Sequence, residues 1–163
     1  MAYAPSADIA RHDSTFHWGA GVGAGLIAGL VFLIAEMGLV WLVNGQSPWG
    51  PPRMIVAMVM GRDVLPPPAT FELTMFAVAG LIHFALAVVY GLIAVLLMRR
   101  LSTGLAMLIG LLFGVAIYYV SFYPIADAMF PWFADARGGV SLFSHALFGA
   151  VLGLGYAMLR RPH

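Results

Sequence analysis

The sequence predicts an all-helical integral membrane protein, with four transmembrane helices in a single membrane domain that covers residues 1–163. Of these residues 62% are hydrophobic and only 9% are charged, whereas a soluble domain carries about 25% charged residues. Four apolar runs are each long enough to cross a hydrocarbon core as a helix, which takes about 20 residues. The runs lack the two-residue alternation of a membrane β-strand. Four helices are therefore expected.

The four predicted spans are joined by one short turn and two long loops. The spans are residues 19–43, 71–98, 104–123 and 140–159. Residues 1–18 form a polar tail, which is unlike a cleaved export signal, and the long loops are residues 44–70 and 124–139. Within the first loop, residues 54–60 are apolar but too short to span, so they are expected to form a short helix in the interface or packed over the bundle.

Basic residues set the expected orientation. Five arginines fall on the side of the membrane that holds both chain ends and the short turn: Arg11, Arg99, Arg100, Arg160 and Arg161. Positive charge of this kind stays in the cytoplasm. On the other side arginines are accompanied by acidic residues. Both termini are therefore expected to be cytoplasmic, with the long loops outside.

The second and fourth spans share a pattern that predicts an internal duplication. His83 and His145 are each followed, at the same spacing, by a glycine (Gly91, Gly153) and then by a pair of arginines. The first and third spans each carry Gly-x-x-x-Gly, as Gly25/Gly29 and Gly110/Gly114. The chain is thus expected to be two helical hairpins that form a parallel repeat, a plan found in transporters. The glycines are also predicted helix-packing sites, either within the bundle or against a partner.

Three ionisable residues lie well inside the spans and are predicted to share one layer. At about 1.5 Å per residue, His83 and His145 both lie about 23 Å from the arginines that end their helices. Glu36 falls about one turn further out on the same scale, and Ser121 takes the equivalent place in the third span. Ionisable groups at this depth cost several kcal/mol unless they face the bundle interior and find partners.

The polar layer has three competing interpretations. In the first it is structural: the histidines bond to neighbouring hydroxyls or backbone carbonyls, and Glu36 pairs with one of them. In the second, His83 and His145 are the axial ligands of a b-type haem. In the third, the layer handles protons or a small solute, with a variant in which Glu36 and the histidines hold a metal. Three methionines are possible thioether ligands for copper in that variant: Met54, Met58 and Met60.

Composition and motifs argue against several classes of function. The absence of cysteine excludes disulfides, thiolate metal sites and covalently attached haem. A net charge of +1 gives no reason to expect a nucleic-acid partner. No metalloprotease, phosphate-loop or serine-hydrolase motif occurs, so the protein is not expected to be an enzyme.

Several stretches resemble a family of small four-helix bacterial inner-membrane proteins, distantly similar to the YagU type. These stretches are residues 47–53, residues 64–71, and His83-Phe84-Ala85-Leu86 with Tyr90-Gly91. The resemblance implies a bacterial inner membrane and brings no catalytic residues. Some proteins of this kind carry a sodium:proline symporter label, but 163 residues are too few for that fold.

The leading functional hypothesis from the sequence is a non-enzymatic accessory or scaffolding subunit of a larger assembly, such as a respiratory complex. Its grounds are the lack of catalytic motifs, the glycine faces and the aromatic residues of the two long loops. Besides the lipid bilayer, the expected partners are other membrane subunits or a second copy of the chain. The alternative is a protein that binds b-type haem, or handles protons or a small solute, through His83 and His145.

Overall fold

The computed structural model describes residues 16–67 and 69–160, and this part of the chain is helical without a strand. Most of the polar tail, and with it Arg11, lies outside the described residues, as does Arg161. Four helical segments are long and apolar enough to cross a membrane: α1 (Trp18–Leu42), α3 (Leu73–Met98), the segment Thr103–Met129 that begins with α4, and α6 (Gly139–Leu159). The chain is therefore a multi-pass helical membrane protein.

The start of α3 is set by a carboxylate cap rather than by hydropathy. Glu72 accepts hydrogen bonds from the backbone N–H groups of Thr74 (3.0 Å) and Met75 (2.8 Å). These bonds hold the pKa of the Glu72 carboxyl below its ordinary value of 4.5. The N-terminal N–H groups of a helix lack intrahelical partners, and an acidic side chain satisfies them. The helix accordingly begins at Leu73, two residues after the predicted start of this span.

The third span is longer than the prediction of residues 104–123, because Pro124 does not end it. After α4 (Thr103–Val120) the helix widens into a π-helical turn, η2 (Ser121–Ile125), and continues as α5 (Ala126–Met129). In this turn the Ala126 N–H bonds to the carbonyl of Ser121, five residues back. A π-turn accommodates the proline ring, which would clash with a carbonyl in a regular helix. Part of the predicted loop 124–139 is thus helical.

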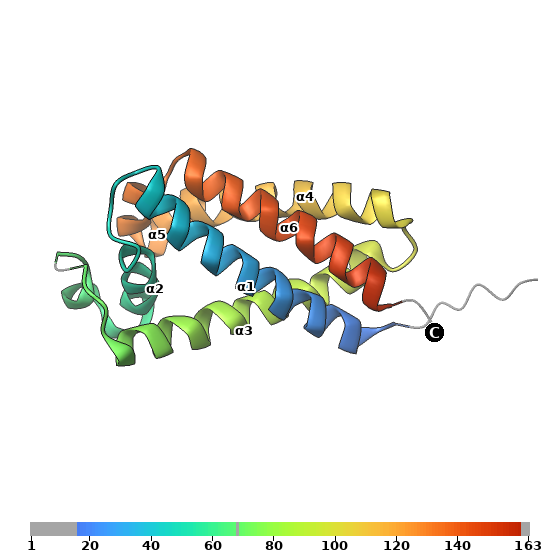
Figure 1. Ribbon diagram of the computed structural model, residues 1–163, viewed down its shortest axis with the longest axis horizontal. Helices are drawn as coiled ribbons and strands as arrows, with labels where there is room; N and C mark the ends of the chain where they lie inside the picture. Colours follow the sequence, from blue (N-terminus) through green and yellow to red (C-terminus); the bar gives the residue numbers. More distant parts are fainter. Residues whose placement is uncertain (1–15, 68, 161–163) are drawn as a thin grey trace, which may run out of the picture.

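The four long segments pack in the order α3, α1, α6, α4. α1 and α6 lie side by side, while α3 packs against α1 and α4 packs against α6 (Figure 1). α3 and α4 are joined by a short turn but barely contact each other beyond it. In Figure 1 they diverge from that turn, so the bundle is closed along α1 and α6 and splayed between α3 and α4.

Glycines let the paired helices approach backbone to backbone. A Cβ added to Gly25 would clash with the carbonyl of Ala87 on α3, and one added to Gly110 would clash with that of Gly149 on α6. Gly114 meets the carbonyl of His145 in the same way. In lipid, helix association depends on such close packing because burial from water supplies no force between spans. The predicted packing glycines are therefore used inside this chain.

Short helices cover the splayed end of the bundle. The first long loop contains α2 (Gly50–Met60), followed by the single turn η1 (Arg62–Val64), and the second contains η3 (Pro131–Ala136). α2 contacts both α3 and η3, and it lies across the wide end of the gap in Figure 1. The apolar stretch 54–60 is thus part of a helix packed over the bundle. We call α2 and η3 together the cap.

Candidate functional site

Glu36 is the one buried charged residue of the described chain. It lies on α1 with 6% of its surface exposed, and its Oε1 accepts a hydrogen bond of 2.7 Å from the Ser141 hydroxyl on α6. Its other oxygen, Oε2, is buried without a hydrogen-bond partner among the described residues. The structural interpretation of the polar layer paired Glu36 with a histidine, whereas its hydrogen-bond partner is Ser141. Half of the carboxylate is therefore left unsatisfied.

Both histidines bond to backbone carbonyls. His83 on α3 donates from Nε2 to the carbonyl of Gly29 on α1, at 2.8 Å. His145 on α6 donates from Nδ1 to the carbonyl of Ser141, one turn earlier in its own helix, at 2.7 Å. A carbonyl oxygen can only accept, so these contacts fix which nitrogen carries the proton. In the neutral imidazoles, His83 Nδ1 and His145 Nε2 are then left as acceptors.

The ring of Phe32 lies close to both imidazoles. Its centroid is 5.3 Å from that of His83 and 4.8 Å from that of His145. A haem iron held by both histidines needs the two rings on opposite sides of an open slot, whereas both rings pack against Phe32. His83 Nε2 is in addition engaged by Gly29. The arrangement is therefore unfavourable for a haem shared by His83 and His145.

A cavity of about 300 Å³ adjoins this polar layer between α3 and α4. Four polar side chains predicted from the sequence border it, and apolar or aromatic side chains make up nearly all the rest of its wall. The polar members are Glu36, His83, Ser121 and His145. The structure thus brings all four residues of the predicted layer to one cavity, although the three ionisable ones form no metal-binding cluster within the described residues.

The cap forms the outer wall of this cavity. Met54 and Met58 of α2 line it together with Phe130 and Phe133 of the second loop, while Met60 is not part of the wall and is 49% exposed. The indole Nε1 of Trp132 donates to the Met54 carbonyl at 3.0 Å and so ties η3 to α2. The methionines closest to the polar layer are therefore wall residues of a largely apolar space.

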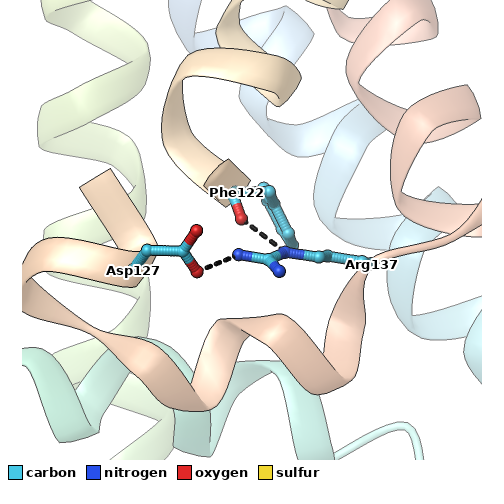
Figure 2. Close-up of polar contacts among 3 residues, drawn as sticks. All are labelled: Phe122, Asp127 and Arg137. Carbon is cyan, nitrogen blue, oxygen red and sulfur yellow. Dashed lines mark hydrogen bonds and ion pairs between the residues drawn. The ribbon is translucent and has the colours of Figure 1, made fainter. Parts of the chain in front are cut away.

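Arg137 anchors the second loop to the π-turn. Figure 2 shows its guanidinium between the backbone carbonyl of Phe122 and the carboxylate of Asp127. Its Nε donates to the Phe122 carbonyl at 2.7 Å, and a terminal nitrogen pairs with Asp127. In a regular α-helix the Ala126 N–H would bond to the Phe122 carbonyl, but in the π-turn it bonds to the carbonyls of Ser121 and Tyr123. Arg137 supplies the Phe122 carbonyl with a donor in its place. An irregular stretch of the third span is thereby stabilised beside the cavity.

A second, more polar cavity of about 520 Å³ lies beside the first. Glu36 borders both, and polar residues of the loops and of α6 line the second: Asn44, Gln46, Ser47, Asp135, Arg137 and Ser141. Glu36 therefore stands between a polar space under the loops and an apolar space inside the bundle.

Ser141 and Phe32 are site residues that the sequence analysis missed. Ser141 precedes His145 by one helical turn, so its position on the same face of α6 was a usable signal. Phe32 is an apolar residue in an apolar helix, and nothing in the sequence separates it from its neighbours. Comparisons with family models, curated proteins and solved structures found no match to this chain.

Proposed function

We propose that this chain is a non-enzymatic membrane protein that binds a small, largely apolar molecule in the cavity between α3 and α4. The main observation is the cavity itself: it measures about 300 Å³ and is walled by apolar and aromatic side chains, with a few polar groups among them. Ligand sites in proteins have this composition, in which apolar walls supply affinity and a few placed polar groups fix orientation. This is the small-solute alternative of the sequence analysis.

The splayed helices suggest how a ligand reaches the cavity. α3 and α4 both line the cavity and barely contact each other beyond their connecting turn (Figure 1). We propose that a molecule dissolved in the bilayer enters the cavity between these two helices. An apolar ligand already concentrates in lipid, so such a path suits the chemistry of the wall.

The proposal places the protein in a bacterial inner membrane with both termini in the cytoplasm. Arg99, Arg100 and Arg160 lie together at the end of the bundle opposite the cap, and Arg160 donates to backbone carbonyls of the α3–α4 turn, including that of Met98 at 2.9 Å. Arginines at one end favour the cytoplasmic side. The cap then lies outside.

We further propose that the two hairpins are repeats of one unit. The contacts between α1 and α3 match those between α4 and α6 at three levels. At the first level Gly21 contacts Gly91, and Ala106 contacts Gly153; at the second Gly25 contacts Ala87, and Gly110 contacts Gly149. At the third level Gly29 contacts His83, and Gly114 contacts His145. The α1 residues are all 85 positions before their α4 equivalents, and the α3 residues are all 62 positions before their α6 equivalents, which supports a duplication.

The accessory-subunit hypothesis has less support once the features behind it are placed in the fold. The packing glycines serve contacts between helices of this chain, and aromatic residues of the loops cover the cavity or pack on one another. Association with other subunits or a second copy stays a prediction, and purification in mild detergent tests it.

Ligand binding can be tested with 1-adamantanol, a compact neutral molecule, added to the protein in lipid nanodiscs and followed by ligand-observed NMR against empty nanodiscs. Leu86 lines the cavity on α3, so a Leu86→Trp variant should fill it and abolish binding. Leu81 on the same helix is 74% exposed and is not part of the wall, so Leu81→Trp should bind like the wild type. Equal binding by both variants would contradict the proposal.

A further inference from the structure

We infer that the ligand of this cavity is an apolar molecule with an ammonium group, a protonated lipophilic amine, and that Glu36 is its counter-ion. The inference rests on the proposed binding function and specifies its ligand class. Three features of the wall carry it: an incompletely satisfied carboxylate, two imidazole acceptors and a set of aromatic rings.

The carboxylate is the strongest of these features. Glu36 is 6% exposed, Ser141 satisfies one of its oxygens, and Oε2 has no partner in the described chain. An ionised carboxylate in an apolar environment is costly unless a charge or hydrogen bonds compensate it. Within residues 16–67 and 69–160, no arginine or lysine borders the first cavity. A cationic ligand beside Glu36 would supply the compensating positive charge that the wall of the cavity lacks.

The histidines favour a ligand that donates hydrogen bonds. Their N–H groups are committed to the carbonyls of Gly29 and Ser141, which leaves His83 Nδ1 and His145 Nε2 as acceptors in the neutral rings. Glu36 and the two neutral imidazoles, all of which border the cavity, therefore have acceptors but no uncommitted N–H donor. An ammonium group has only donors, whereas a carboxylate or phosphate has only acceptors.

The aromatic wall favours the same charge. Six rings line the cavity: Phe32, Tyr90, Phe122, Phe130, Phe133 and Phe148. The face of an aromatic ring carries partial negative charge and attracts cations within about 6 Å. Arg137, the arginine of the neighbouring polar cavity, is already bonded to Phe122 and Asp127. Neither fixed charge nor ring electrostatics in this wall favours an anion.

The test compares three ligands of one shape in wild-type nanodiscs: 1-adamantylammonium, 1-adamantanol and adamantane-1-carboxylate, with empty nanodiscs as the control for partition into lipid. We expect the ammonium ion to bind at least about tenfold more tightly than the alcohol, as a charge-assisted hydrogen bond implies. The carboxylate should bind more weakly than both. The isosteric Glu36→Gln variant, checked for folding by circular dichroism, should lose the preference for the ammonium ion over the alcohol.

The outcomes separate this inference from the proposed function. If the ammonium ion and the alcohol bind equally, or if Glu36→Gln retains the preference, the amine assignment is overturned while the cavity remains a binding site. Tighter binding of the carboxylate overturns it as well. If no ligand binds beyond the empty-nanodisc level, the proposed function fails together with the inference. The wild-type comparison decides the charge preference even if the Glu36→Gln variant does not fold.

Discussion

At the scale of single residues, the glycines differ in how closely a neighbouring helix backbone approaches them. Gly91 on α3 lies against the backbone of Gly21 on α1, and a Cβ at Gly91 would clash with the Gly21 carbonyl. Gly80 on the same helix has nothing within 4 Å of the position its Cβ would take. These two glycines of one helix thus differ in whether a neighbouring helix backbone is in contact, which makes Gly80 a control for Gly91.

We predict that Gly91→Ala lowers the free energy of unfolding by about 1–3 kcal/mol, the usual cost of overpacking a tight contact. Gly80→Ala should leave stability unchanged or raise it slightly, because alanine is the better helix former. Unfolding by a denaturing detergent, followed by circular dichroism, measures both variants. Equal stability of the two would show that α1 and α3 do not approach this closely.

For the residues of the polar layer, the sequence predicts the depth in the membrane but not the hydrogen-bond partners. Helix length and hydropathy placed Glu36, His83 and His145 at similar depths, because depth follows from the rise per residue alone. Their partners depend on helix rotation and on which helices are neighbours, and apolar helices carry little information about either. Ser141 and Phe32 were therefore missed, and the histidine partner that the structural interpretation gave Glu36 was wrong.

At the scale of elements, the cap forms the outer wall of the cavity. α2 and η3 come from different loops, and one hydrogen bond with defined geometry joins them, from Trp132 Nε1 to the Met54 carbonyl at 3.0 Å. Arg62 also lies over the Trp132 ring, 5.8 Å from its centroid. Trp132 is therefore a central link between the two halves of the cap.

We predict that Trp132→Phe loosens the cap without unfolding the bundle. Phenylalanine keeps an aromatic ring but removes the donor, a loss of about 1 kcal/mol. Amide exchange in α2 should accelerate about fivefold, with exchange in α1 and α6 unchanged, as measured by hydrogen exchange and mass spectrometry. Trp41→Phe is the control, since Trp41 is 62% exposed on α1. Unchanged exchange in α2 would mean that the indole does not hold the cap.

Element boundaries were predictable only where hydropathy determines them. The four spans and the short helix over residues 54–60 followed from apolar run lengths. The end of the third span could not be predicted in this way, because a proline such as Pro124 normally ends a helix. Here the helix continues through a π-turn, and Arg137 of the next loop bonds to that turn. A long-range bond of this kind leaves no local signal in the sequence.

At the scale of the whole molecule, the proposed repeat is asymmetric in a way that creates the cavity. If one hairpin repeated the other with two-fold symmetry, the packing of α1 on α6 would recur between α4 and α3. α1 and α6 do pack along their length, whereas α3 and α4 barely touch. Opening one of two equivalent interfaces is a simple way for a duplicated bundle to acquire a binding site.

The orientation of the molecule determines which compartment the cap and the polar cavity face. The chain contains no cysteine, so single cysteines can be introduced without background labelling. Asp63 in η1 at the capped end and Ser102 in the α3–α4 turn are both exposed. They mark the two ends of the bundle.

We predict that the Asp63→Cys variant reacts with a membrane-impermeant maleimide in intact cells, whereas the Ser102→Cys variant reacts only after the cells are permeabilised. The reason is the arginine cluster at the turn, which should remain in the cytoplasm. The reversed pattern would place the cap inside and would contradict the orientation proposed from the arginines. Labelling of both variants in intact populations would indicate mixed orientation, and the polar cavity beside Glu36 would then not face one defined compartment.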